Sequence, residues 1–285
     1  MSAAGKLIDF LETTVPQHYW ISIAGFLCGV YLAIKKIPEY EIIWPLLVVG
    51  PLIVAAFNSF NAVFDRDIDR INKPYRSIPA GRLSPTIVLV FSAVLYFISI
   101  FISFFIVRNN IFAWLVLADT LLTILYSLPP IRLKNAFIIS NLVVGLHYGF
   151  FPITYGWVLY SDISLLPIPI IAITTLLAFS ANILKDFEDY VGDKAYKVRT
   201  IPVFYGPEEA ARLVLYLLLI PYFVLFLLVF LGHMETQLAF VGLFVLWAYK
   251  IGRDLMEEPL ERGETARTQA ILLGICTVLA LALFS

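Results

Sequence analysis

Residues 58–81 read NSFNAVFDRDIDRINKPYRSIPAG, and they join a strongly apolar stretch to a short basic segment. Within them Asn61, Asp65 and Asp69 recur at intervals of four residues, and Asn58 lies three residues before the first. In a helix, residues three or four positions apart lie on one face. The stretch therefore predicts a helix that ends with several oxygen-bearing side chains on the same side.

Residues 186–203, which read DFEDYVGDKAYKVRTIPV, contain a second acidic cluster. Asp189 and Asp193 are four residues apart, again at the end of an apolar stretch. Asn182 and Asp186 precede them at spacings that continue the same helical face, so both are possible additional ligands. The sequence thus predicts two helix ends of one chemical kind.

Each cluster is followed by nearly the same basic tag. The first tag is Arg76-Ser77-Ile78-Pro79 and the second is Arg199-Thr200-Ile201-Pro202. The shared order of apolar helix, amide, acids and tag predicts a pseudo-repeat of two similar halves, at about 18–130 and 136–285. No Pro-, Ser- or Gly-rich linker separates the halves, so we expect a single membrane domain over residues 1–285.

The composition predicts an all-α integral membrane protein. Of the 285 residues 60% are hydrophobic and 14% are charged, and the mean hydropathy is +0.87. Soluble domains carry about 25% charged residues. A helix needs roughly 20 apolar residues to cross a bilayer. We expect nine transmembrane helices, near residues 18–35, 42–64, 84–107, 111–128, 136–160, 165–187, 208–231, 236–252 and 268–285.

The distribution of Lys and Arg predicts the orientation. Basic residues gather in the loops after the second, fourth, sixth and eighth expected helices, which are cytoplasmic if the N-terminus is cytoplasmic. Both acidic clusters then face the cytoplasm from a multi-pass protein of the cell membrane. Before the first span, Leu7, Ile8, Phe10 and Leu11 predict a short helix on the membrane surface. The net charge of −1 gives no reason to expect a nucleic-acid partner.

The acidic clusters have the donor chemistry of a magnesium site. Unpaired carboxylates on one helix face would repel one another, and Mg²⁺ takes oxygen ligands, commonly one or two carboxylates together with substrate phosphates. We therefore assign as metal ligands Asn61, Asp65, Asp69, Asp189 and Asp193, the four aspartates being catalytic. Nearby cations and a tyrosine would bind the diphosphate of a substrate. These are Lys73, Arg76, Tyr126, Arg132, Lys134, Lys197 and Arg199.

These two segments and the loop YSLPPIRLK at 126–134 resemble the signatures of the UbiA superfamily of intramembrane prenyltransferases. The resemblance implies nine helices around a central cavity, metal-binding aspartates at its cytoplasmic mouth, and an opening toward lipid. It also implies two Mg²⁺ ions as cofactor, an isoprenoid diphosphate such as geranylgeranyl diphosphate as donor, and a lipophilic acceptor. One departure is Ala62, where many relatives carry an acid.

The acceptor and the base that removes its proton stay open at this point. The superfamily uses aromatic quinone precursors, a prenylated glycerol phosphate of archaeal ether lipids, tetrapyrroles and carotenoids. We favour an aromatic quinone precursor, with digeranylgeranylglyceryl phosphate synthase-type transfer as the alternative. Asp69 or the released diphosphate could accept the proton. A cation-coupled secondary transporter is the rival class, but acids near one face with cations beside them suit an anionic ligand and metal better.

Overall fold

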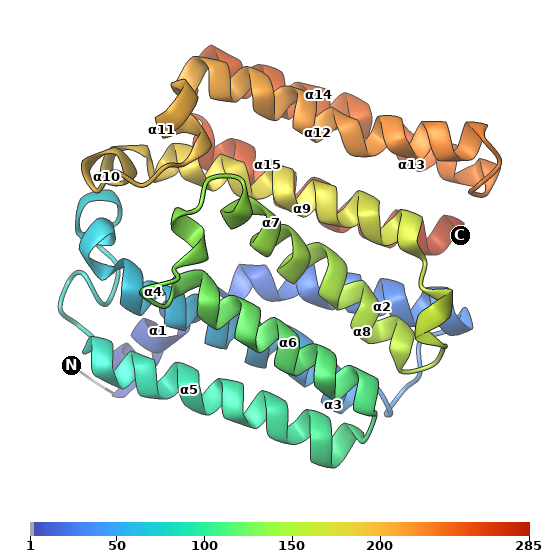
Figure 1. Cartoon of the computed structure of the whole chain (residues 1–285), viewed down its shortest axis with the longest axis horizontal. Helices are drawn as coiled ribbons and strands as arrows, with labels where there is room; N and C mark the ends of the chain where they lie inside the picture. Colours follow the sequence, from blue (N-terminus) through green and yellow to red (C-terminus); the bar gives the residue numbers. More distant parts are fainter. Residues whose placement is uncertain (1–2) are drawn as a thin grey trace. The chain divides into compact units, whose positions relative to one another are not determined.

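The computed structural model describes residues 3–285, and over that range it consists of helices and loops without strands. Three π-helical segments, Val48–Leu52, Ser103–Val107 and Leu146–Phe150, continue or join α-helices. The α-helices (Figure 1) are α1 Ala3–Thr14, α2 Tyr19–Ile34, α3 Ile43–Leu47, α4 Ile53–Asn72, α5 Pro85–Ile102, α6 Asn110–Ser127, α7 Ile139–Gly145, α8 Phe151–Val158, α9 Ile168–Glu188, α10 Tyr190–Ala195, α11 Ile201–Tyr205, α12 Pro207–Phe230, α13 Ala239–Gly242, α14 Val245–Glu257 and α15 Gly263–Phe284.

Seven helical stretches in residues 3–285 are long and apolar enough to cross a membrane. They indicate a multi-pass membrane protein, as the composition predicts. The predicted count of nine is not confirmed. The seven are Pro16–Ile34, Ile43–Asn72, Pro85–Val107, Asn110–Ser127, Ile168–Glu188, Pro207–Phe230 and Gly263–Phe284.

The predicted spans near 136–160 and 236–252 are helical but differ from the other seven. In the first, α7, a π-helical segment and α8 follow one another without a gap, but Asn141 and His147 make this stretch more polar. In the second, the helix is interrupted between α13 and α14. Neither stretch is therefore both long and apolar enough to be counted as a membrane span.

The chain packs as two compact units, and the division between them passes through α2. The first unit joins the described residues up to Ile23 with Pro38–Lys134. The second joins Ala24–Ile37 with Asn135–Ser285. A structural repeat of the two halves and a single membrane domain stay predictions.

In the first unit α4 is the central helix, packed between α1, α5 and α6 (Figure 1). Near its acidic end, Val63 packs with Ile78 and Leu83 of the following loop and with Val88 of α5. A buried hydrogen bond of 3.0 Å between the hydroxyls of Tyr96 and Thr123 joins α5 to α6. These contacts fix the loop that carries the first basic tag against the helix that carries the first acids.

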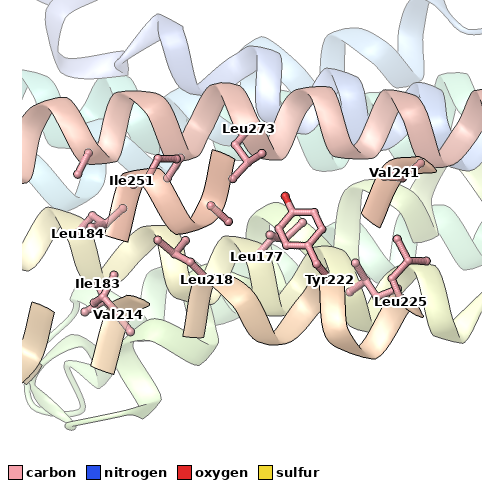
Figure 2. Close-up of a cluster of buried hydrophobic side chains, with 14 of the residues drawn as sticks. Leu177, Ile183, Leu184, Val214, Leu218, Tyr222, Leu225, Val241, Ile251 and Leu273 are labelled. Carbon is pink, nitrogen blue, oxygen red and sulfur yellow. The ribbon is translucent and has the colours of Figure 1, made fainter. Parts of the chain in front are cut away.

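In the second unit α9 packs against α7, α12 and α15. Figure 2 shows its buried side chains Leu177 and Leu184 among residues of α12, α13, α14 and α15. Tyr222 of α12 is fully buried there, and its hydroxyl lies 2.8 Å from that of Thr277 in α15. Since α9 leads into the second acidic cluster, this core fixes the direction from which the cluster is presented.

Glycines allow the second part of α2 to approach α8 at backbone distance. A Cβ built on Gly29 would lie 2.0 Å from the carbonyl oxygen of Ile153, and one on Gly156 would lie 2.1 Å from that of Phe26. Gly25 and Gly29 form a G-x-x-x-G pattern, which is typical of tightly packed membrane helices. The pair of helices can therefore keep this spacing only with glycine at the contact.

Gly29→Ala is expected to destabilise the protein, because the added methyl group meets backbone that must move apart. Overpacking of this kind costs about 1–3 kcal/mol, so the thermal midpoint of the purified protein in detergent should fall by several degrees. Gly274→Ala in α15 is the matched control, since a Cβ there meets nothing within 4 Å. An equal midpoint for the two variants would contradict the close approach.

Candidate active site

The first acidic cluster lies on one continuous helix, as its spacing predicts. Asn58, Asn61, Asp65 and Asp69 all belong to α4, and the side chains of both aspartates are buried. Asn58 uses its amide nitrogen to hold neighbouring backbone, donating to Thr14 O at 3.2 Å and to Val54 O at 2.9 Å.

Cations from two loops meet the first cluster. Arg76 Nη1 lies 3.1 Å from Asp69 Oδ2, and Arg132 Nη2 lies 3.3 Å from Asp65 Oδ1. Lys134 also forms an ion pair with Asp65. The sequence-predicted metal ligands and phosphate-binding residues of this half therefore do come together, and the basic side chains neutralise the buried carboxylates.

The remaining predicted residues of the first unit lie at different points along α4. Ser127 Oγ donates to Asn61 Oδ1 at 3.1 Å, which links α6 to α4. Tyr126 is buried, with its ring edge-on to Phe57 at 5.4 Å. Lys73 is also buried, only 5% exposed, just after the end of α4.

Arg132 is half-buried and has an unused donor. Its Nη2 donates to Phe64 O at 3.0 Å, while its Nε atom is buried and has no hydrogen-bond partner within residues 3–285. Partial burial lowers the pKa of this guanidinium, which nevertheless stays charged at neutral pH. A half-buried cation with a donor to spare is a suitable contact for an anionic ligand.

The second acidic cluster departs from its predicted geometry. The expectation of one helix face through Asp193 is wrong, because α9 ends at Glu188 and α10 begins at Tyr190. The backbone bond from Asp193 N to Asp189 O, at 2.9 Å, still keeps one helical turn between the two acids. Asp186, Asp189 and Asp193 are all buried, at 8%, 6% and 7% exposure.

The neighbours of the second cluster are also partly different from those expected. Lys185 Nζ lies 2.9 Å from Asp189 Oδ2, and Asn182 Nδ2 donates to Asn141 Oδ1 at 2.7 Å. Lys197 and Arg199 of the second tag region are exposed, Lys197 lying two residues before the tag, and the Arg199 guanidinium lies 5.5 Å from the ring centre of Phe204. The arginine of the second tag is thus exposed, whereas Arg76 of the first tag lies against an acid.

The donor set of each unit fits a divalent cation. Nowhere in residues 3–285 do three His, Cys, Asp or Glu side chains converge as a metal group. Mg²⁺ does not require such a group, since one or two carboxylates with substrate phosphates suffice. Carboxylate and amide oxygens are available from Asn61, Asp65 and Asp69 on α4, and carboxylates from Asp189 and Asp193. These residues would hold the ion.

Two features of the site were missed by sequence reasoning. Lys185 is one helical turn before Asp189, and that spacing was sufficient to predict their ion pair. Ser77 of the first tag is held by Asp9 and Glu12 of α1. No local sequence pattern predicts the contact of Ser77 with Asp9 and Glu12, because the partners lie far apart in the sequence.

Comparisons with known proteins agree on one family. The profile of the UbiA prenyltransferase family matches residues 22–257. A digeranylgeranylglyceryl phosphate synthase of Saccharolobus solfataricus is 32% identical over 281 residues, 93% of this chain and 90% of that protein. The bacteriochlorophyll synthase 34 kDa chain of Chloroflexus aurantiacus is 27% identical over 254 residues, 88% of this chain and 76% of that protein.

A solved structure has the same fold. It is that of a UbiA homolog from Archaeoglobus fulgidus bound to GPP and Mg²⁺. The match has a TM-score of 0.71 and 20% sequence identity, and it covers 95% of this chain and 99% of that one.

Proposed function

The chain belongs to the UbiA prenyltransferase family, and from that premise we propose that it moves a polyprenyl group from an isoprenoid diphosphate to a lipophilic acceptor in a Mg²⁺-dependent reaction. The observation that carries the proposal is the set of ion pairs between buried aspartates and basic side chains in the C-terminal half of α4. Asp65 and Asp69 are buried, and each holds a basic side chain of a loop that the sequence assigns to phosphate binding.

We assign the roles of the residues as follows. Asn61, Asp65 and Asp69 would hold one Mg²⁺, and Asp189 and Asp193 would hold a second. Such ions, when bound, would supply positive charge to neutralise the diphosphate and polarise its oxygens.

The basic side chains act on the leaving group. When the bond between the allylic carbon and the diphosphate oxygen breaks, both electrons stay with that oxygen. Arg76, Arg132 and Lys134 are placed to stabilise the resulting charge. The acceptor then attacks the allylic carbocation, and its proton leaves to Asp69 or to the released diphosphate.

For the acceptor we propose a prenylated glycerol phosphate. The digeranylgeranylglyceryl phosphate synthase compared above matches nearly the whole chain, and it is named for a lipid of this kind. A tetrapyrrole is the second candidate, because a bacteriochlorophyll synthase chain matches at 27% identity. The quinone precursor that the sequence analysis favours has no such support from these relatives. Nothing in the comparisons supports the transporter alternative.

Turnover with a panel of acceptors tests the proposed function. Purified protein is incubated with radiolabelled geranylgeranyl diphosphate, Mg²⁺ and one acceptor at a time, and the labelled product is separated from the donor. We expect product with the prenylated glycerol phosphate and none after chelation of the metal. Product with only a tetrapyrrole or quinone precursor would refute the acceptor assignment alone. No product and no metal-dependent binding of the diphosphate would refute the enzyme's proposed donor and cofactor.

A further inference from the structure

Helix α1 makes polar contacts with the loop of the first basic tag, and no function described so far uses them. Asp9, which is 6% exposed, accepts hydrogen bonds from Ser77 Oγ at 3.0 Å and from Arg82 Nε at 2.8 Å. Glu12 Oε2 accepts from the backbone N–H of Ser77 at 2.9 Å, and it shares the single hydroxyl proton of Ser77 with Asp9. Two carboxylates one helical turn apart therefore grip a single serine.

The gripped serine follows Arg76 directly in the chain. Arg82 completes the contact from the other side, because its Nη2 donates to the carbonyl oxygen of Tyr75 at 3.0 Å. The backbone is thus held on both sides of Arg76, whose guanidinium reaches Asp69 at 3.1 Å. Fixing both neighbours of an arginine restricts where its side chain can reach.

The grip has no counterpart in the second tag. Thr200, the equivalent of Ser77, is 7% exposed, and its hydroxyl has no hydrogen-bond partner in the described part of the chain. Arg199 lies exposed against Phe204 instead of on an acid. The first tag, which α1 contacts, is therefore also the tag whose arginine forms an ion pair with a predicted metal ligand, Asp69.

Helix α1 is itself fixed to α4, so it can serve as a rigid support. The hydroxyl of Thr13 lies 3.0 Å from that of Ser59, and Asn58 donates to Thr14 O. The polar side of α1 thereby faces the unit, while Leu7, Ile8 and Leu11 are exposed. This arrangement suits the membrane-surface helix that the sequence predicts.

We propose that α1 is a positioning element for the diphosphate site, in which Asp9 and Glu12 hold Ser77 so that Arg76 stays aligned with the leaving group. The inference rests on the proposed function, because it assumes that Arg76 binds diphosphate. Asp9, Glu12, Ser77 and Arg82 act through Arg76 and touch no substrate.

The contact between Asp9 and Arg82 is charged at neutral pH. The hydrogen bond from Arg82 holds the pKa of Asp9 below its usual value of 3.8, although burial opposes this, and the same contact raises the pKa of Arg82. Because the pKa of Asp9 is lowered on folding, its contribution is complete above pH 3.8 and is lost as the pH falls through the lowered value. The contact is therefore intact throughout the working range of an assay at neutral pH.

A double-mutant cycle in diphosphate binding tests the positioning role. The variants are Glu12→Ala, Arg76→Gln and the double variant, with Glu39→Ala as control, an exposed carboxylate of the same unit. The Kd of radiolabelled geranylgeranyl diphosphate is measured in Mg²⁺. We expect Glu12→Ala to weaken binding about tenfold, and the double variant to bind no more weakly than Arg76→Gln alone. Additive losses, or wild-type binding by Glu12→Ala, would overturn the proposal.

Amide hydrogen exchange separates this inference from the proposed function. Loss of the acceptor for the Ser77 N–H should speed exchange in peptides covering 76–82 in Glu12→Ala, but not in Glu39→Ala, whether or not the protein binds diphosphate. Unchanged exchange would refute the grip by α1. A wild-type protein that binds no diphosphate with Mg²⁺ would instead refute the proposed function. If Glu12→Ala does not fold, Ser77→Ala replaces it in the binding cycle with Arg76→Gln, because it removes the hydroxyl contacts and keeps the backbone one, and the same non-additive loss of binding is expected.

Discussion

Asp65→Asn and Asp193→Asn are each expected to lower turnover by about 10³-fold or more, the range in which electrostatic and metal contributions to catalysis fall. Asparagine keeps the shape of the side chain but removes the charge that would hold a metal ion. For Asp65 the change also leaves Arg132 and Lys134 without their carboxylate. The measurement is transfer of label from geranylgeranyl diphosphate to the acceptor at saturating Mg²⁺.

The control for this prediction is Asp67→Asn on the same helix. Asp67 is about half exposed and pairs with the exposed Arg70 at 3.0 Å, so it should have near-normal activity. Removing one member of a buried ion pair can cost about 3–5 kcal/mol of stability, so each variant is also checked for its thermal midpoint. Near-normal turnover by folded Asp65→Asn or Asp193→Asn would contradict the assigned metal ligands.

Lys134→Met is expected to have opposite effects on the two ligands of the site. Without ligand the Lys134 ammonium neutralises Asp65, so it competes with a cation for that carboxylate. When diphosphate binds, the same ammonium can turn to the phosphate oxygens and release Asp65 for the metal. Metal and diphosphate should therefore favour each other's binding, and Lys134 should be part of that coupling.

The measurement uses Mn²⁺ as a spectroscopic substitute for Mg²⁺. In Lys134→Met we expect Mn²⁺ alone to bind more tightly than in the wild type, and diphosphate to bind about tenfold or more weakly in the presence of metal. Lys36→Met removes an exposed ammonium and serves as control. If both ligands bind more weakly to Lys134→Met, or neither changes, the exchange of partners at Asp65 is refuted.

The helical periodicity of the first cluster was sufficient to predict its geometry. Asn61, Asp65 and Asp69 lie on one face because α4 continues to Asn72, past the last of them. For the second cluster the same reasoning failed, since the helix breaks at Asp189 and the backbone turns before Asp193. The four-residue spacing of Asp189 and Asp193 does not reveal that the helix is interrupted at Asp189. The backbone hydrogen bond between these two residues is present despite the interruption.

Contacts between segments that are distant in the chain could not be predicted from the sequence. The apolar side of α1 predicts a surface helix, but the pairing of Glu12 with Ser77 depends on how α1 packs against α4. In the same way, Asn141 and His147 make a predicted span less apolar than its neighbours. Both are buried in the second unit, where Asn141 accepts a hydrogen bond from Asn182 and the His147 ring packs edge-on against Tyr148. Hydropathy gives the number of apolar stretches, whereas packing decides how each is used.

The most direct test of metal-dependent diphosphate binding is equilibrium binding of radiolabelled geranylgeranyl diphosphate as a function of Mg²⁺, with Asp65 and Asp193 varied one at a time. The wild type should bind only with metal, and Asp65→Asn and Asp193→Asn should each lose most of this binding. Wild-type, metal-dependent binding by either folded variant would contradict the assignment of that aspartate to the diphosphate site.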